Sequence, residues 1–247
     1  MSKKTVLKAS ALALAIAAAP SAALAEVSGS LGISSNYLWR GQQLFTGGVV
    51  HGSIDYGMEN GLYAGAWTSS ESGRTEYDLY VGFGGELDGG ITYDISYIDY
   101  NYTGGGTGEN GGDSSQSGSD FEEVHLGLGV AGFGFDVFIG VGDYGHNDND
   151  DLNADGEQDN NGDNYYAISY GVNQISAVLG MYDFDGDPED PETDASNFND
   201  YTHLDVSYAI TDQLTFTVSK VIDQDETNGV EQMDDDVVMQ VSYGFAF

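Results

Sequence analysis

The chain of 247 residues ends in Val237-Val238-Met239-Gln240-Val241-Ser242-Tyr243-Gly244-Phe245-Ala246-Phe247. Every odd-numbered residue of this stretch is apolar or aromatic, and most residues between them are small or polar. Successive side chains of a β-strand point to opposite faces, whereas a helix would spread the odd-numbered residues around its axis. The pattern therefore predicts a half-buried strand that ends on a terminal aromatic residue.

The same alternation recurs upstream in segments 76–83, 91–97, 135–141 and 203–208. In each segment one face suits hydrocarbon and the other suits water, which is typical of the strands of a transmembrane barrel. No segment after Ala25 approaches the ~20 consecutive apolar residues of a membrane helix. A chain of this kind that crosses a membrane has to do so as a closed barrel.

The polar connections between these segments alternate in length. Short turns are expected near 59–61, 85–90, 131–132, 173 and 211–212, and longer segments at 40–46, 70–75, 103–120, 145–163, 185–200 and 223–236. This alternation is typical of a bacterial barrel whose two termini lie on the same side of the membrane. The predicted fold class is therefore all-β, an antiparallel transmembrane β-barrel of about twelve strands. The alternative is a soluble, secreted β-sandwich, whose strands also alternate.

Aromatic residues near the predicted strand ends are candidates for the girdles that flank the lipid-facing band of such a barrel. They are Tyr37, Trp39, Tyr56, Tyr63, Trp67, Tyr100, Tyr102 and Tyr144. The last strand, with Tyr243, Phe245 and Phe247 on one face, resembles the signal that the barrel-assembly machinery reads in outer-membrane proteins.

The first 25 residues have the pattern of a cleaved secretory signal peptide. Lys3, Lys4 and Lys8 form its positive region, residues 11–19 its apolar core, and Ala23-Leu24-Ala25 its cleavage site. The pattern predicts export to the outer membrane. Residues 26–247 then form the barrel domain, with long acidic extracellular loops at 103–120, 145–163, 185–200 and 223–236.

The composition sets the electrostatics of the exported chain. The sequence holds 41 Asp and Glu against 6 Lys and Arg. Three of the basic residues lie in the signal, so the mature chain carries a formal charge of 3 − 41 = −38. A chain this acidic repels nucleic acid and attracts cations. Because the chain has no cysteine, its stability has to come from backbone pairing and buried apolar surface.

The chain also shows a family pattern near its beginning. Ser34-Ser35-Asn36-Tyr37-Leu38-Trp39-Arg40-Gly41 is followed by Gly-Ser-Ile-Asp-Tyr at 52–56, Gly-Leu-Tyr-Ala-Gly-Ala-Trp at 61–67, and Glu76-x-Asp78-x-Tyr80-x-Gly82. With these residues the chain resembles the TorF-type porin family of proteobacteria, long catalogued as conserved proteins of unknown function. Beyond residue 82, only the strand rhythm and the terminal Phe247 match. The resemblance implies an outer-membrane pore and names no substrate.

Polar residues on the face opposite the apolar one are expected to line the lumen. They are His51, Asp55, Glu76, Asp78, Asp94, Glu123, His125, Asp136, His203 and Asp205. Carboxylates in a low-dielectric wall concentrate cations and exclude anions; the alternative is a wet face of simply solvated residues. Arg40 and Arg74 join the set, because an arginine at the outer end of a strand can pair with lumen carboxylates or hold an anionic ligand.

One acidic loop has the ligand spacing of an EF-hand-type calcium site, with Gly156 at the sixth position. The candidate ligands are Asp151, Asn153, Asp155, Glu157 and Asp159. Gly162 occupies the twelfth position, where such a loop has a bidentate glutamate. Calcium binding is one interpretation of these acidic runs, and bridging through cations to lipopolysaccharide is a related one. The other is a solvated surface adapted to salty water.

The sequence as a whole predicts a narrow passive diffusion pore in the outer membrane for small polar solutes, with a cation preference and no cofactor. The expected partners are outer-membrane lipid, lipopolysaccharide, the barrel-assembly machinery and small solutes, and not nucleic acid. The alternative is an occluded structural or adhesive outer-membrane barrel that acts through its acidic loops. A barrel hydrolase is the third hypothesis, although the chain has only 4 histidines and lacks the Gly-x-Ser-x-Gly nucleophile motif.

Overall fold

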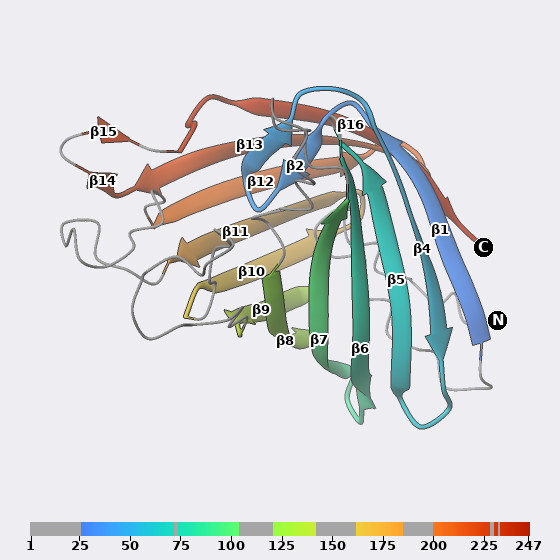
Figure 1. Ribbon diagram of the computed structural model, residues 1–247. Helices are drawn as coiled ribbons and strands as arrows, with labels where there is room; N and C mark the ends of the chain where they lie inside the picture. The colour runs from blue at the N-terminus through green and yellow to red at the C-terminus, as the bar shows by residue number, and fades with distance from the viewer. Residues whose placement is uncertain are drawn as a thin grey trace, which may run out of the picture.

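The computed structural model describes residues 26–71, 74–103, 121–141, 162–184, 200–227, 230–231 and 233–247. The predicted signal peptide at 1–25 lies outside them, as do most of the predicted acidic loops. Twelve of the described strands form one closed antiparallel barrel (Figure 1). They are β1 (Glu26–Ser34), β4 (Val49–Gly57), β5 (Leu62–Ser70), β6 (Thr75–Leu87), β7 (Ile91–Thr103), β8 (Phe121–Val130), β9 (Phe133–Gly140), β10 (Asn164–Val172), β11 (Ile175–Asp183), β12 (Tyr201–Ala209), β13 (Leu214–Gln224) and β16 (Val238–Ala246).

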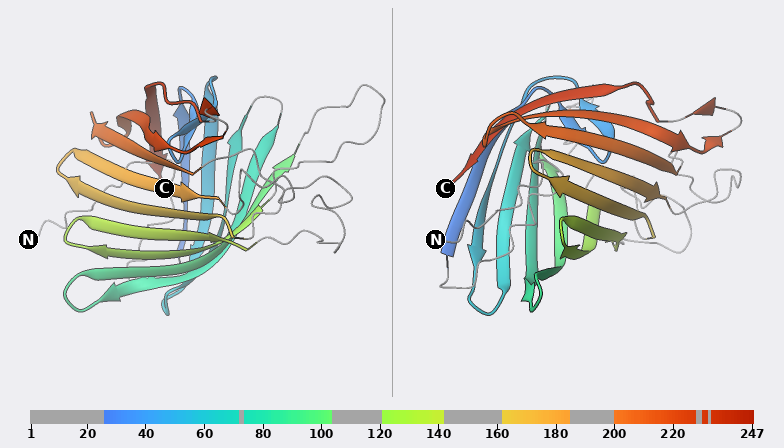
Figure 2. Two further views of the ribbon diagram at one scale, coloured as in Figure 1. Left: turned by 90° about the vertical axis from the view of Figure 1, so that its left-hand side faces the viewer. Right: turned by 180° about the vertical axis from the view of Figure 1, so that it is seen from behind.

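The first barrel strand closes on the last. β1 pairs with β16 from Ser30↔Ala246 to Ser34↔Ser242, and with β4 along its other edge. Gly29 and Phe247 exchange two backbone hydrogen bonds, each of 2.9 Å. Figure 2 shows the closed sheet from two further sides. A sheet without a free edge satisfies its own backbone donors and acceptors. The all-β class and the twelve strands are confirmed, and the alternative of a two-sheet sandwich is wrong.

The connections alternate in length as predicted, with one exception. The turns at 58–61, 88–90, 131–132, 173–174 and 210–213 all lie at the end of the barrel that holds both termini. At the other end the connections are longer, except between β5 and β6. There β5 ends at Ser70 and β6 begins at Thr75, and the Glu71 amide donates to the Arg74 carbonyl at 3.0 Å. The polar residues of that segment suggested a longer loop, but its two end residues, Ser70 and Thr75, belong to the strands.

The outward face of the barrel is apolar. Along β6 the odd-numbered residues from Tyr77 to Phe83 are exposed, while the even-numbered residues from Glu76 to Gly84 are buried. The same parity holds in β7, β9 and β16, and in β12 the even-numbered residues are the exposed ones, as the alternation predicted. Large side chains such as Ile95, Phe135 and Val206 therefore stand exposed around the whole barrel. A soluble monomer rarely exposes an apolar surface of this extent.

The inward face has two different linings. Toward the end with the longer loops, large side chains pack into an aromatic core inside the barrel, formed by Tyr80, Ile98, Tyr100, Phe138, Tyr165, Ala167, Tyr182, Tyr201 and Val221. Toward the termini the inward side chains are small and polar. Ser207 and Thr217 share a hydrogen bond of 2.8 Å there, and Ser30 and Ser53 one of 2.9 Å. The aromatic core thus fills one half of the lumen.

The predicted aromatic girdle is wrong for most of its residues. Tyr63 and Trp67 on β5, and Tyr100 and Tyr102 on β7, occupy inward-facing positions. Of the predicted set, Tyr56 is exposed on the outside, and Tyr144 lies outside the described residues. The prediction used nearness to a strand end, whereas the period-two parity of the strand decides which face a side chain joins.

Residues 40–46 do not form a free outer loop, which corrects the prediction for that segment. Two short strands, β2 (Tyr37–Trp39) and β3 (Gln42–Phe45), pair with each other as a separate two-stranded sheet. Figure 1 shows β2 inside the bend of the large sheet, beside β12 and β13. We call residues 37–45 the lumen hairpin.

A second small hairpin, of β14 (Glu226–Thr227) and β15 (Val230–Glu231), lies between β13 and β16. In the part of the chain that the structure describes, no helix has the length and apolar character needed to span a membrane.

Candidate functional site

The lumen hairpin turns through Arg40 and Gly41. Their φ angles are 46° and 84°, and the register Trp39↔Gln42 leaves these two residues as the whole turn. Two-residue hairpin turns of this kind need positive φ at both positions. A positive φ is uncommon for an arginine, so the contacts of its side chain have to hold it there.

The Arg40 side chain makes a bidentate ion pair with Glu123 on the opposite wall. Its Nη1 and Nη2 donate to Oε1 and Oε2 at 2.7 and 2.6 Å, and both side chains are nearly fully buried. The Tyr100 hydroxyl donates to the same carboxylate at 3.0 Å. Burial alone would lower the pKa of Arg40, but the adjacent Glu123 charge raises that pKa above its usual value. The turn therefore carries a permanent positive charge.

Aromatic rings surround the Arg40 guanidinium on the remaining sides. Its Cζ lies 4.6 Å from the ring centroid of Phe138, 4.5 Å from Tyr165 and 5.3 Å from Tyr182, all on the barrel wall. Trp39 of the hairpin itself is 4.3 Å away. Cations within about 6 Å of an aromatic face are attracted by its quadrupole. We call Glu123, Phe138, Tyr165 and Tyr182 the Arg40 cage.

Backbone contacts also attach the hairpin tip to the wall. The Tyr201 hydroxyl donates to the Arg40 carbonyl at 2.9 Å, and the Ser219 hydroxyl to the Gly41 carbonyl at 3.5 Å. Because β1 and β8 lie on opposite sides of the twelve-strand ring, a hairpin that follows β1 and binds Glu123 on β8 crosses the lumen.

The base of the hairpin is tied to β16. The Asn36 side-chain amide donates to Gln43 at 2.7 Å and to the Met239 carbonyl at 3.3 Å. In return the Gln240 side chain donates to the Asn36 carbonyl at 3.0 Å. These bonds fix the direction in which the hairpin leaves the end of β1.

His125 lies between two carboxylates in the lumen wall. Its Nδ1 is 3.2 Å from Asp94 Oδ1, and its Nε2 is 2.9 Å from Asp136 Oδ1. The Tyr63 hydroxyl also donates to Asp94, at 2.8 Å. Two carboxylates face at most one imidazolium, so the group stays net negative in either protonation state of the histidine.

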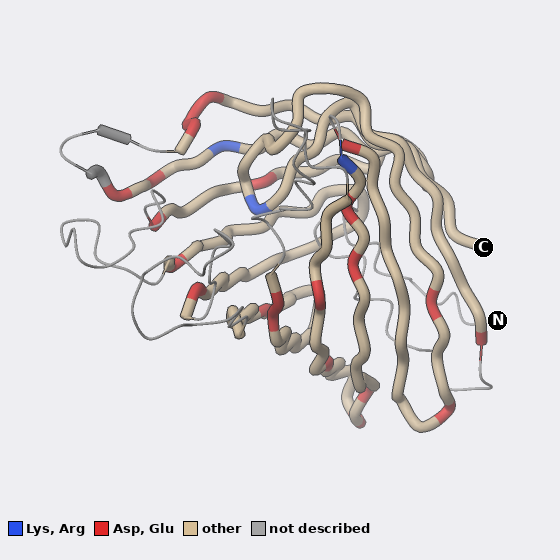
Figure 3. Tube along the Cα trace, in the orientation of Figure 1, with Lys and Arg blue, Asp and Glu red and all other residues tan. Residues whose placement is uncertain are grey.

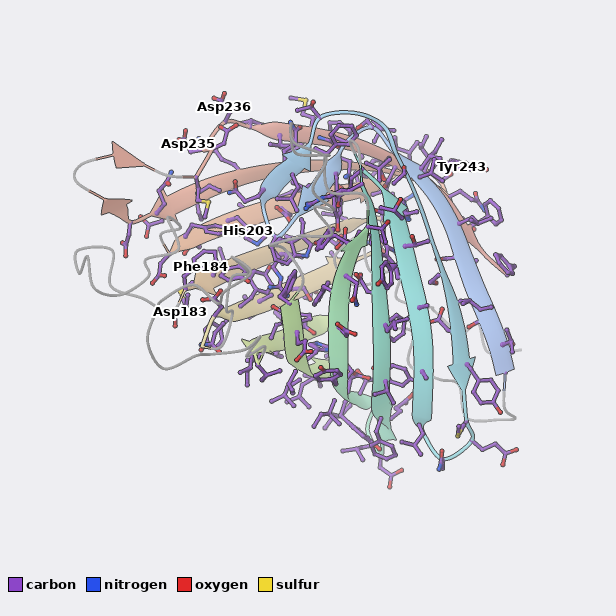
Figure 4. The ribbon with its side chains drawn as sticks, viewed as in Figure 1. Asp183, Phe184, His203, Asp235, Asp236 and Tyr243 are labelled. Carbon is purple, nitrogen blue, oxygen red and sulfur yellow. The ribbon has the colours of Figure 1, made fainter. Side chains whose placement is uncertain are left out.

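Two further lumen carboxylates are held by hydroxyl groups. Asp55 accepts from the hydroxyls of Ser53 and Tyr80. Asp205 accepts from Ser219 and lies 3.1 Å from His203 Nδ1, while His203 Nε2 is 2.8 Å from the Tyr165 hydroxyl. His203 is fully buried, and Figure 4 places it inside the sheet, with Tyr243 on the outer surface.

A third acidic group lies on β6 and the turn before it. Glu76 accepts from the Tyr102 hydroxyl at 2.9 Å, and Glu71 pairs with Arg74 at 2.7 Å. Four buried side-chain oxygens of this patch have no hydrogen-bond partner among the described residues: Ser69 Oγ, Glu71 Oε1, Glu76 Oε2 and Asp78 Oδ1. Buried acceptors without a partner are costly, so this patch favours positive charge nearby.

The predicted lumen residues all lie on the inner side of the barrel or at its outer end. His51 stacks near Trp67 with 6.2 Å between ring centroids, and the Arg74 guanidinium lies 4.2 Å from the Tyr102 ring. Acidic residues far outnumber basic ones along the described chain (Figure 3). The sequence reasoning missed the aromatic members of the cage. Phe138 is two residues from Asp136 on β9, so the alternation of the strand is enough to predict that its ring points into the lumen.

The geometry around the histidines gives little support to a hydrolase. The Ser96 hydroxyl is 3.4 Å from His125 Nδ1, but the Asp94 carboxylate is nearer to the same nitrogen, and Ser96 is 3% exposed. His203 and its partner Tyr165 are buried, and Asp205 is partly buried. An activated nucleophile needs a free base and access to substrate.

The remaining predicted sites are on the surface or outside the described residues. The whole candidate calcium loop, Asp151 to Asp159, lies outside them. Among the described residues one exposed group, Asp234, Asp235 and Asp236, brings three possible ligand atoms within 4.8 Å of one another. The Lys220 side chain is 45% exposed and donates to the Asp235 carbonyl at 2.9 Å. Tyr243, Phe245 and Phe247 are exposed on the outer face.

A family model described as "Bacterial protein of unknown function (Gcw_chp)" matches residues 17–151, which is more than half of the chain. The chain belongs to the Gcw_chp family. In this Gcw_chp protein the match includes the lumen hairpin, Glu123 and Phe138, while the rest of the cage lies beyond it. It also covers Ser34 to Gly82, on which the resemblance to the TorF-type family rests; that name is no part of the family's description. None of the curated proteins compared with the sequence matches it.

Three solved structures are similar to the Gcw_chp chain over nearly their whole lengths. The COG4313 outer membrane channel from Pseudomonas putida F1 has 12% identity and a TM-score of 0.47, with 91% of this chain and 96% of that chain covered. The KdgM porin has 7% identity and a TM-score of 0.46, covering 89% and 98%. The NanC porin has 12% identity and a TM-score of 0.40, covering 90% and 98%. Similarities this distant transfer neither a solute nor a conductance.

Proposed function

We propose that this Gcw_chp protein is an outer-membrane porin, a narrow passive diffusion pore for small polar solutes with a preference for cations. The observation that carries the proposal is the closed twelve-strand barrel with apolar side chains on every outward face and carboxylates on the inner one. Only a closed barrel lets strands cross lipid with every backbone group paired. The resemblance to the TorF-type porin family points the same way.

The charges of the lumen support the cation preference. Asp55, Asp94, Asp136 and Asp205 are spread around the ring on β4, β7, β9 and β12, and the patch on β6 adds unpartnered carboxylate oxygens. Arg40 is neutralised by Glu123. A potential of one sign within low-dielectric walls concentrates counter-ions. No cofactor or enzymatic step belongs to this proposal.

The competing function is an occluded structural or adhesive barrel. The lumen hairpin and the aromatic core favour it, because they fill the outer half of the lumen. Such a barrel would act through its acidic loops, by holding calcium or by bridging to lipopolysaccharide. We keep it as the second candidate.

Planar-bilayer recording separates the two. Protein refolded in detergent is inserted under a salt gradient, and folding is checked by the shift that a folded barrel shows on an unheated gel. Small discrete steps, with a reversal potential of cationic sign, support the porin. Silence from folded protein, or a reversal potential of anionic sign, contradicts it. Membrane fractionation of the producing cell tests the proposed location.

A further inference from the structure

We infer that the barrel wall carries a guanidinium-binding site, formed by the Arg40 cage, and that Arg40 fills it as a tethered ligand which holds the lumen hairpin across the pore. When Arg40 leaves the cage, the hairpin can swing out of the lumen. The effect on conduction rests on the proposed function. The binding site itself does not.

The cage is matched to a guanidinium in shape and charge. Glu123 accepts from both Nη atoms in parallel, which a planar guanidinium satisfies and a rounded ammonium does not. The Tyr100 hydroxyl fixes the carboxylate by donating to Oε2. The Phe138, Tyr165 and Tyr182 rings then enclose the cation with their faces within 5.3 Å. The ligand class is therefore guanidinium compounds rather than simple amines.

The cage belongs to the wall and not to the hairpin. Its residues lie on β8, β9, β10 and β11, four consecutive strands of the ring. Glu123 pairs with Gly140 and Phe138 with Tyr165 in the ladder, so the backbone holds them in place. Removal of Arg40 should leave this site formed and empty.

The polar attachment of the hairpin to the far wall depends mainly on Arg40, and Trp39 packs there beside the rings of Phe121 and Tyr182. β2 and β3 form a sheet of their own and share no ladder with the barrel. Besides the Arg40 side chain, the hydrogen bonds between the tip and the wall among the described residues are the Tyr201 bond of 2.9 Å and the long Ser219 bond of 3.5 Å. On the other strand of the hairpin, Leu44 is 47% exposed. A contact of this kind can open without disturbing the barrel.

Tethering also sets how strongly a free ligand has to bind. A short flexible tether gives Arg40 an effective concentration of millimolar order at the cage. A free guanidinium solute that binds the cage as tightly as the Arg40 side chain has to reach this concentration before it displaces Arg40. The empty cage of an Arg40→Ala variant removes this competition.

The binding test compares Arg40→Ala with the wild type in detergent. Unfolding midpoints are measured with methylguanidinium and with methylammonium at up to about 20 mM, far below denaturing concentrations. We expect methylguanidinium to raise the midpoint of Arg40→Ala and methylammonium not to. The wild type, whose cage is filled by Arg40, should respond less than Arg40→Ala, and the double variant Arg40→Ala/Glu123→Gln should not respond. Equal responses to the two cations, or a response that survives Glu123→Gln, overturn the site.

The opening test uses the absence of native cysteine. Leu38→Cys, buried in the hairpin at 6% exposure, is treated with a maleimide in the wild-type and the Arg40→Ala backgrounds. We expect at least a tenfold faster reaction in Arg40→Ala, while the exposed Leu44→Cys reacts quickly in both. Lys220→Gln, which removes an exposed cation, is the matched charge control and should leave Leu38→Cys protected. Equal protection in all backgrounds contradicts the opening.

Conductance links the site to the pore. If the porin function holds, Arg40→Ala conducts several-fold more than wild type or Lys220→Gln. If no variant conducts although labelling shows the hairpin released, the pore proposal fails and the tethered-ligand inference stands. If wild type conducts and Arg40→Ala neither labels nor conducts differently, the inference fails and the pore proposal stands.

Discussion

Gly41 and His203 touch across the lumen. A Cβ built on Gly41 would lie 2.4 Å from both Cβ and Cγ of His203, and its φ of +84° disfavours any side chain. The tip of the lumen hairpin therefore fits against β12 only because residue 41 is glycine.

Gly41→Ala should displace the tip of the lumen hairpin from its contact with His203 on β12. We expect a loss of about 1–3 kcal/mol in unfolding free energy, as for other overpacked sites. The displaced tip also exposes the backbone after Arg40 to trypsin, which should cleave there slowly or not at all in the wild type. Gly57→Ala is the control, because nothing lies within 4 Å of its added Cβ. Equal resistance of both variants to trypsin would contradict the close contact.

The two buried acids Glu123 and Asp78 should respond oppositely to neutralisation. Glu123→Gln leaves Arg40 as a buried, unpaired charge, and we expect a loss of about 3–5 kcal/mol. Asp78→Asn relieves a buried carboxylate whose Oδ1 lacks a partner among the described residues, so it should be neutral or stabilising. Urea unfolding in micelles measures both, and a large loss in Asp78→Asn would sink this distinction.

The ion preference of the pore should depend on the carboxylates around His125. In the double variant Asp94→Asn/Asp136→Asn, we expect the reversal potential under a salt gradient to move toward zero, because the wall loses two negative charges. Asp235→Asn, which removes one exposed charge, serves as the control. An unchanged reversal potential in the double variant would show that the selectivity arises elsewhere.

The lipid-facing band can be mapped with matched arginine substitutions on β6. Val81 and Leu87 are 52% and 54% exposed and share one outward face. Val81→Arg, in the middle of the strand, should lower the unfolding free energy by about 2–4 kcal/mol. Leu87→Arg, at the strand end, should lower it by about 0–1 kcal/mol. Unfolding from lipid vesicles measures the difference. Similar small losses of unfolding free energy at both positions would mean that this face of β6 contacts water and not lipid.

The strands and the inward set could be predicted because both follow from one rule. Period-two parity assigns a face to every residue, and a long run such as Thr75 to Leu87 leaves little doubt about it. The girdle prediction for Tyr100 and Tyr102 was wrong because it relied on their nearness to a strand end and not on parity. Both residues are on the same strand face as Asp94, so parity predicts that both point into the lumen.

The lumen hairpin could not be predicted in the same way. Its strands have three and four residues, too few for alternation to show. The sequence suggested that Arg40 pairs with a lumen carboxylate, but the partner, Glu123, lies 83 residues away. Its choice depends on the order of the strands around the ring and on the direction that Asn36 gives to the hairpin. Neither the strand order nor the direction of the hairpin can be predicted from the residues near Arg40 alone.

The pairing of β1 with β16 has a consequence for how the barrel closes. β1 pairs along one edge with β16, which follows all the other barrel strands in the chain. Without β16, the edges of β1 and β13 that pair with it are left unpaired, and unpaired strand edges are sites of aggregation. Closure of the barrel, and with it the absence of a free edge, therefore depends on β16.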